Sequence, residues 1–81
     1  MSNQGVKVKQ LWKGMFNYNR ELYILYCNAY TARQAWVCFC HRLADKHGVR
    51  PQMVMNYFNG QRDNYEISIE LEVKEDDEET N

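Results

Sequence analysis

The chain has 81 residues, of which 44% are hydrophobic and 14% aromatic, and its formal net charge is −1. This length allows one domain with one core, which the aromatic side chains can build because each buries a large area. No apolar run reaches the roughly 20 residues that cross a bilayer, and residues 1–9 lack the apolar part of a signal peptide, so we expect a soluble, cytoplasmic protein with no membrane contact.

The first predicted element is a strand over residues 6–17, where apolar and polar side chains alternate imperfectly. Gly14 within this strand indicates a bulge or a close backbone approach. Residues 17–20, Asn-Tyr-Asn-Arg, have the composition of a tight turn. Together they predict a hairpin with the strand that follows.

A second strand is predicted over residues 21–30, and its side chains are apolar on both faces. One face carries Leu22, Ile24 and Tyr26, and the other carries Tyr23, Leu25, Cys27 and Ala29. A strand that is apolar on both sides is typical of the buried middle of a sheet. We therefore expect this strand to be central.

A helix is predicted over residues 31–47. Thr31 and Gln34 have the spacing of a capping box, in which each side chain satisfies a backbone N–H of the first turn. Apolar residues then recur every three or four positions, and Gly48 suits the left-handed residue that ends a helix. The positions expected to lie on the sheet are Trp36, Phe39 and Leu43.

The chain continues with a short helix over residues 51–58, begun by Pro51, and a strand over residues 64–74. Apolar and polar side chains alternate strictly in this strand, so one face lies on the core and the other in water. The outer face is mostly acidic and includes Glu66, Glu70 and Glu72. The order β-β-α-α-β predicts one α+β domain over residues 1–74, in which a small antiparallel or mixed three-stranded sheet packs on one long and one short helix.

The charges are divided unevenly along the chain. Up to residue 62, nine Lys and Arg oppose two acids, a net charge of +7, and from Asp63 onward nine acids oppose one Lys, a net charge of −8. Residues 75–81 are acidic and contain no apolar side chain, so we expect a disordered tail. Such an asymmetry bears on the choice of binding partner.

Residues 42–57 resemble the helix-turn-helix segment of DNA-binding repressors. The residues that match its packing positions are Ala44, Gly48, Val49, Val54 and Tyr57. The resemblance implies that Arg50, Gln52, Met53 and Asn56 face the DNA groove. Alternatively, Val54, Tyr57 and Phe58 are core residues of a short helix that returns the chain to its last strand.

The first two predicted strands interleave lysines with aromatic residues. These are Lys7, Lys9 and Lys13 with Trp12, Phe16, Tyr18, Tyr23 and Tyr26. They could form a basic face on which unpaired bases stack. Alternatively, Trp12 and Phe16 belong to the core and the lysines to a solvated face.

The three cysteines favour reduced thiols, since an extracellular protein of this size would carry an even and larger set. Cys38 and Cys40 would project about 200° apart on a helix and so could not bind one metal ion together. Cys38 and His41 form the one conceivable nucleophile and base, but the sequence places no third group beside them. We predict no catalytic site, metal site or cofactor.

Two non-enzymatic functions make use of the charge division. In the favoured one, the basic body binds nucleic acid and the acidic tail competes for the same surface. The predicted contacts are Lys7, Lys9, Lys13, Arg42, Lys46, Arg50, Gln52, Asn56 and Arg62. In the alternative, Glu66, Glu70, Glu72 and the tail engage a basic protein surface, as small inhibitors from phages and mobile elements do. An open strand edge could also join two copies into a homodimer.

Overall fold

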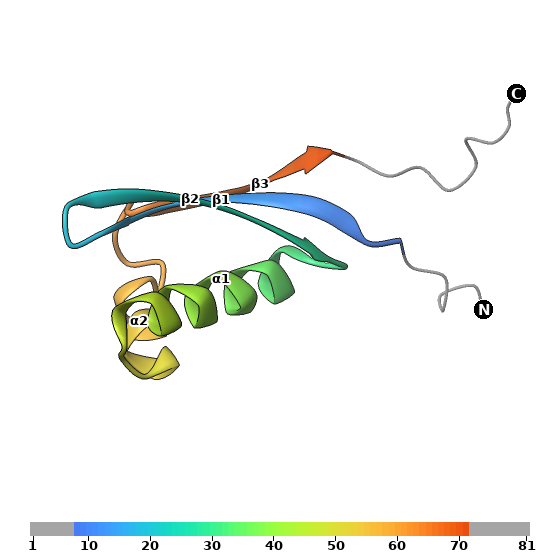
Figure 1. Ribbon diagram of the computed structural model, residues 1–81. Coiled ribbons are helices and arrows are strands. Elements are labelled where there is room, and N and C mark those ends of the chain that lie inside the picture. The colour runs from blue at the N-terminus through green and yellow to red at the C-terminus, as the bar shows by residue number, and fades with distance from the viewer. Residues whose placement is uncertain (1–7, 72–81) are drawn as a thin grey trace, which may run out of the picture.

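The computed structural model describes residues 8–71. Its elements are β1 (Gln10–Tyr18), β2 (Glu21–Ala29), α1 (Ala32–His47), α2 (Pro51–Tyr57) and β3 (Tyr65–Leu71). The strands form an antiparallel sheet of order β2-β1-β3, and both helices lie on one side of it (Figure 1). The predicted α+β fold and element order are confirmed. The expected tail and residues 72–74 of the expected third strand lie outside the described residues.

The prediction that β2 is central is wrong, because β1 lies between β2 and β3. β1 pairs with β2 from Gln10 to Tyr18 and with β3 from Leu11 to Phe16. β2 is an edge strand, and one of its two apolar faces is turned to solvent. The apolar side chains on both faces of β2 can each pack against other apolar groups. The two helices among residues 8–71 cover only one of these faces.

The hairpin turn consists of Asn19 and Arg20, whose φ angles are 53° and 71°. Two successive positive φ values give a turn whose twist matches that of the flanking strands. β1 begins at Gln10, later than predicted, while Lys7 lies outside the described residues. β2 ends at Ala29, one residue earlier than predicted.

Both ends of α1 are capped as the sequence predicts. The Oγ1 of Thr31 accepts a hydrogen bond of 3.1 Å from the Gln34 N–H. The Oε1 of Gln34 accepts one of 2.9 Å from the N–H of Tyr30, one residue before the expected partner. At the other end, Gly48 has a φ of 67° and donates its N–H to the carbonyls of Ala44 and Asp45.

The core is built around Phe16 of β1. Its ring centroid lies 5.6 Å from that of Phe39 and 4.8 Å from that of Phe58, and all three side chains are fully buried. A Cβ added at Gly14 would lie 2.6 Å from the Phe16 ring and 2.7 Å from the Phe39 ring. The nearest neighbours of Gly14 are therefore side-chain rings, where the sequence predicted a bulge or a close backbone approach, and the register shift of the sheet lies beside Leu11.

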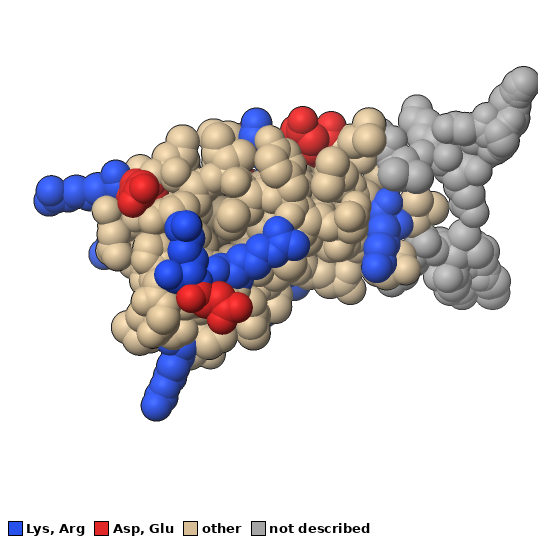
Figure 2. Space-filling view, viewed as in Figure 1, with Lys and Arg blue, Asp and Glu red and all other residues tan. Residues whose placement is uncertain are grey.

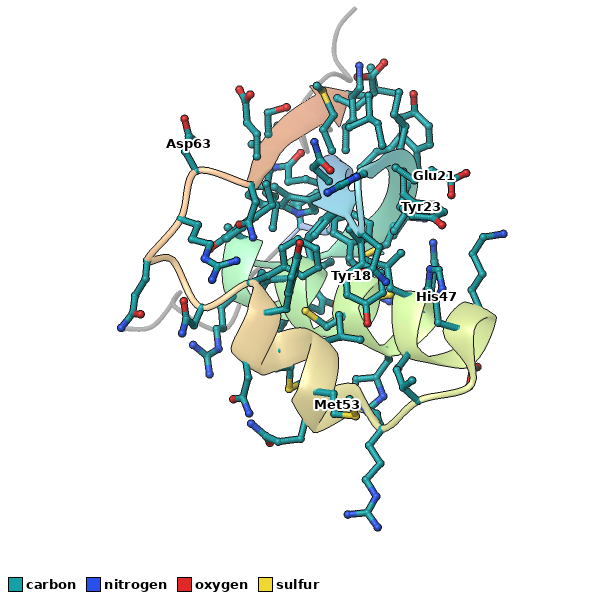
Figure 3. The ribbon with its side chains drawn as sticks, turned by 90° about the vertical axis from the view of Figure 1, so that its left-hand side faces the viewer. Tyr18, Glu21, Tyr23, His47, Met53 and Asp63 are labelled. Atoms are coloured by element: carbon teal, nitrogen blue, oxygen red, sulfur yellow. The ribbon has the colours of Figure 1, made fainter. Side chains whose placement is uncertain are left out.

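The C-terminal end of α1 is held against the hairpin by aromatic contacts. The His47 ring lies 4.8 Å from the Tyr18 ring and 5.4 Å from the Tyr23 ring, between centroids, and both contacts are edge-on (Figure 3). The hydroxyl of Tyr23 donates a hydrogen bond of 3.1 Å to the Glu21 carboxylate. His47 therefore acts as a packing residue between the helix and the first two strands.

Candidate functional site

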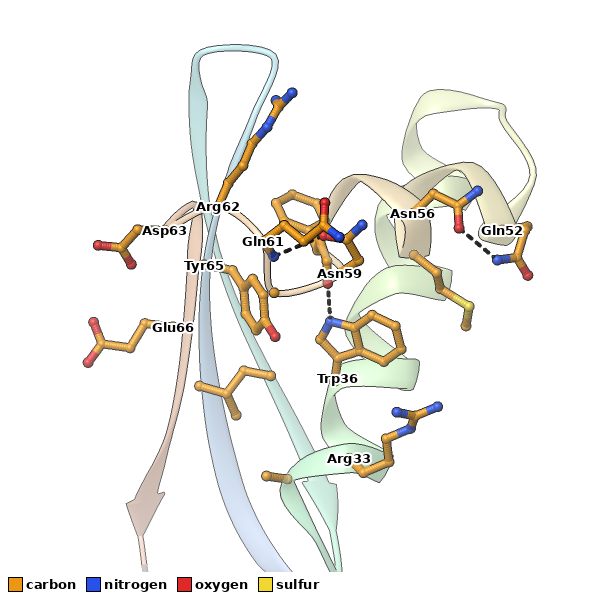
Figure 4. Close-up of a pocket in the computed structure, with 15 residues that line it drawn as sticks. Arg33, Trp36, Gln52, Asn56, Asn59, Gln61, Arg62, Asp63, Tyr65 and Glu66 are labelled. Carbon is orange, nitrogen blue, oxygen red and sulfur yellow. Dashed lines mark hydrogen bonds between the residues drawn. The ribbon is translucent and has the colours of Figure 1, made fainter.

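A hollow of about 950 Å³ lies beside β3, between the N-terminal half of α1, the end of α2 and the loop that leads into β3 (Figure 4). Its lining brings together an aromatic wall, several amide side chains and two arginines. A volume of this size falls within the range of small-ligand sites. We refer to this hollow as the β3 groove.

Trp36 forms the aromatic wall of the β3 groove. Its indole Nε1 donates a hydrogen bond of 3.1 Å to the Phe58 carbonyl. The guanidinium carbon of Arg33 lies 5.1 Å from the centroid of the Trp36 ring, a distance typical of a cation–π contact. Tyr65, across the groove, stacks on Phe16 with centroids 5.3 Å apart and an interplanar angle of 12°. These contacts fix the orientation of both aromatic rings.

The amide side chains come from α2 and from the loop after it. The Nε2 of Gln52 donates a hydrogen bond of 3.0 Å to the Oδ1 of Asn56, one turn further along α2. The Oδ1 of Asn59 accepts one of 3.0 Å from the backbone N–H of Gln61. These bonds leave the Oε1 of Gln52 and the amide nitrogens of Asn56 and Asn59 to bind a ligand.

The loop that closes the groove is fastened to the end of α2. The Nδ2 of Asn64 donates a hydrogen bond of 3.1 Å to the Tyr57 carbonyl, and the guanidinium of Arg62 lies 5.9 Å from the centroid of the Tyr57 ring. Asp63 and Glu66 also border the groove, but their carboxylates point away from Trp36 (Figure 4). The lining of the groove therefore carries two arginines and two acids, and Arg62, like the two carboxylates, extends away from Trp36.

The structure brings three of the predicted nucleic-acid contacts together in the β3 groove, namely Gln52, Asn56 and Arg62. The other described contacts lie apart from it, and they are Lys9, Lys13, Arg42, Lys46 and Arg50. Figure 2 shows cationic side chains at separate places on one face, with a central group that adjoins acidic side chains. Lys7 lies outside the described residues.

The scattered cations have different surroundings. Arg42 donates a hydrogen bond to the carbonyl of Tyr26 at the edge of β2. The Nζ atoms of Lys46 and Lys9 lie 5.8 Å and 5.6 Å from the centroids of the Tyr23 and Tyr30 rings. Arg50 is exposed at the N-terminus of α2. These residues do not form a single basic patch.

The predicted stacking face of lysines and aromatic rings does not form, because the aromatic residues point toward the helices. Phe16 and Tyr18 are buried, and Trp12 and Tyr23 pack against the core. Tyr26 lies on the opposite face, where it is paired with Lys13. The alternative, in which Trp12 and Phe16 belong to the core, is confirmed.

The segment that resembles a helix-turn-helix folds as the end of α1, a turn and α2. Ala44 and Val54 are buried, as both interpretations of the sequence require. Gln52 and Met53 are exposed on α2, which has only seven residues. The packing of this segment fits a helix that returns the chain to β3.

Of the predicted protein-binding acids, Glu66 and Glu70 are exposed on β3. Glu66 is paired with Met15 of β1, so it lies on the side of the sheet that the helices leave open. Glu72 lies outside the described residues.

The cysteines are free thiols, and Cys27 and Cys40 are buried. Burial, together with a hydrogen bond to Cys38, raises the pKa of the Cys27 thiol to about 11. Burial alone raises the pKa of Cys40 to about 12. Both thiols are neutral at physiological pH and so are poor nucleophiles and metal ligands. Within residues 8–71 no three His, Cys, Asp or Glu side chains are grouped so that they could hold a metal ion.

Sequence reasoning missed several residues of the β3 groove. Arg33 and Trp36 are three positions apart on α1, a spacing that places them on one helix face, but Trp36 was assigned to the core. Asn59, Gln61 and Tyr65 carry no local signal of binding, since only the folded loop brings them opposite Trp36.

No protein-family model matches the chain, and no curated protein or solved structure is detectably similar to it. Neither helix among residues 8–71 has the length and apolar character needed to cross a membrane. The function is therefore argued from the site itself.

Proposed function

We propose that this chain is a non-enzymatic, cytoplasmic protein that binds single-stranded nucleic acid in the β3 groove. The observation that carries the proposal is the meeting of Trp36, the amides of α2 and its following loop, and Arg33 and Arg62 in one hollow. The free thiols of all three cysteines support a reducing compartment.

The groups of the groove match the parts of a nucleotide. Amide side chains donate to and accept from the edges of unpaired bases, and aromatic or guanidinium planes stack on base faces. Arg62, exposed at the rim, would pair with phosphate oxygens. Arg33, whose guanidinium carbon lies 5.1 Å from the centroid of the Trp36 ring, would extend the stacking surface or bind a second phosphate.

A second, smaller hollow would allow a bound nucleic-acid strand to continue beyond its first nucleotide. Its volume is about 300 Å³, and its lining shares Asn56, Asn59, Gln61 and Arg62 with the β3 groove. A single strand could therefore run from one hollow to the other past Arg62.

The charge of the described body supports the same proposal. Residues 8–71 contain eight Lys and Arg against five Asp and Glu. The scattered cations would attract a polyanion from a distance, while the groove would fix its position. The acidic tail, residues 75–81, would compete for these cations.

The test is a titration of labelled oligouridylate, oligothymidylate and a DNA duplex at low and at physiological salt. We expect the single strands to bind best, with an affinity that falls as salt rises. A version that ends at Lys74 should bind more tightly. In a Trp12→Phe background, the remaining fluorescence of Trp36 should be quenched by a stacked base.

Matched arginine variants separate the groove from general electrostatics. Arg62→Gln and Arg33→Gln should each weaken binding about fivefold to tenfold, whereas Arg20→Gln in the hairpin turn removes the same charge away from the groove and should have a much smaller effect. An equal loss in all three variants would show that the groove is not the site. No binding of any probe at low salt would overturn the proposal.

A further inference from the structure

The side of the sheet that the helices leave open carries exposed apolar side chains. Leu22, Ile24 and Tyr26 of β2 are 55%, 48% and 45% exposed, and Leu71 of β3 is 61% exposed. Single exposed apolar residues are ordinary, but contiguous ones mark interaction surfaces. We refer to this side of the sheet as the open face (Figure 1).

Leu22, Ile24 and Tyr26 stand at alternate positions of β2 and form one row, whereas Leu71 lies opposite Leu11 at the far end of β3. Met15 of β1 is paired with Ile24 on one side and with Glu66 on the other. One position along, Lys13 lies between Tyr26 and Ser68. Paired residues point to the same face, so rows of side chains cross the open face from an apolar β2 to a polar, acidic β3.

The edge of β2 is less accessible than the open face. Arg42 of α1 donates to the carbonyl of Tyr26 and so occupies the middle of that edge. A partner that added a strand to β2 would have to displace this contact. On the open face, the apolar side chains of β2 are about half exposed to solvent.

The acidic border of the open face indicates the charge of a partner. Glu66 is exposed there, and Glu70 is exposed further along β3, at the register shift. The ten residues that follow β3 in the sequence contain six acids and one Lys. A second copy of this chain would set the same acids opposite them and would offer Lys13 as the one cation of the three strands. A partner with cationic side chains beside apolar ones would complement both halves of the face.

We propose that the open face binds a basic amphipathic segment of a partner protein. The apolar side chains of the segment pack on Leu22, Ile24 and Met15, and its Lys or Arg side chains lie over Glu66 and Glu70. This surface lies on the other side of the sheet from the helices that line the β3 groove, and Glu66, at the edge of the sheet, borders both sites.

The test uses a fluorescent leucine-lysine helical peptide as the probe and a leucine-glutamate peptide of the same length as its control. We expect the full chain to bind the leucine-lysine peptide and not the leucine-glutamate one. Ile24→Thr, which keeps the β-branched shape, and the double variant Glu66→Gln with Glu70→Gln should each weaken binding about tenfold.

Two matched variants control for exposed apolar and acidic groups elsewhere. Met53→Thr on α2 and Asp45→Asn on α1 alter an exposed Met and an exposed acid outside the open face, and binding should not change. Failure to bind the leucine-lysine peptide, or equal losses in all four variants, would overturn the proposal. So would sedimentation that shows a dimer of the wild type which Ile24→Thr dissociates, because a second copy would then occupy the face.

Discussion

The two faces of the sheet are built from the same three strands and differ in what covers them. On the helix-covered face, Phe16 and Phe39 are fully buried and their rings contact each other. On the open face, Leu22 and Ile24 are about half exposed. The apolar pattern of a strand tells which side chains share a face, but the covering layer decides whether they stabilise the fold or remain to bind a partner.

The largest expected difference between the faces is in how much the free energy of unfolding falls when an apolar side chain is truncated. Phe16→Ala should lower the free energy of unfolding by about 4 kcal/mol, because it removes a ring from the centre of the core. Leu22→Ala on the open face should cost less than about 1 kcal/mol. Urea unfolding followed by circular dichroism measures both, and similar costs would mean that the open face is covered in solution.

A smaller loss of stability is expected when the covered face gains one methyl group. Gly14→Ala places a Cβ against the rings of Phe16 and Phe39, so the free energy of unfolding should fall by about 2 kcal/mol. Urea unfolding measures this loss as well. Adding Phe39→Leu trims one of the two rings, so the double variant should cost less than the sum of the single ones. Strict additivity would contradict the close contact.

The smallest expected effect concerns the thiols of the covered face. The pKa values of Cys27 and Cys40 rise from 9.0 to about 11 and about 12, so the folded protein keeps protons that the unfolded chain loses above pH 9. Their contribution to stability is complete below pH 9 and is lost as the pH rises toward those values. The urea midpoint should therefore fall between about pH 8 and about pH 10.5.

A variant without the buried thiols controls this measurement. The double variant Cys27→Ser with Cys40→Ala should show a smaller fall over the same range, since the other titrating groups are unchanged. At about pH 8, a thiol reagent should label the partly exposed Cys38 much faster than the two buried cysteines. An equal fall of the urea midpoint in both proteins, or equal labelling rates for all three cysteines, would show that water reaches the covered face.

Much of the fold could be predicted from local chemistry. The cap at Thr31, the stop at Gly48, the start of α2 at Pro51 and the alternation of β3 each depend on neighbouring residues, and each is found in the structure. The order of strands could not be predicted in this way. β2 is apolar on both faces and still lies at the edge, because its position depends on which strand pairs with β3.

The candidate site was predictable only in part. Gln52, Asn56 and Arg62 were predicted from charge and from a resemblance, and the structure brings these three together. Lys13 and Arg42 were predicted on the same grounds and lie outside the groove. No local sequence pattern fixes the distance between two residues that belong to different elements. Asn59 and Gln61 lie opposite Trp36 because the Trp36 indole bonds to the Phe58 carbonyl at the start of this loop, a contact between residues far apart in sequence.

The sequence by itself determined the elements, their order and the division of charge, since these follow from side-chain periodicity, capping and composition over a few residues. The tertiary structure decided that β1 is central, that the aromatic rings of β1 face the helices, and that a groove forms beside β3. The physical reason is that burial and pairing are properties of contacts between segments. The chemistry of an apolar side chain favours its burial. Which residues it packs against is decided by how the whole chain folds.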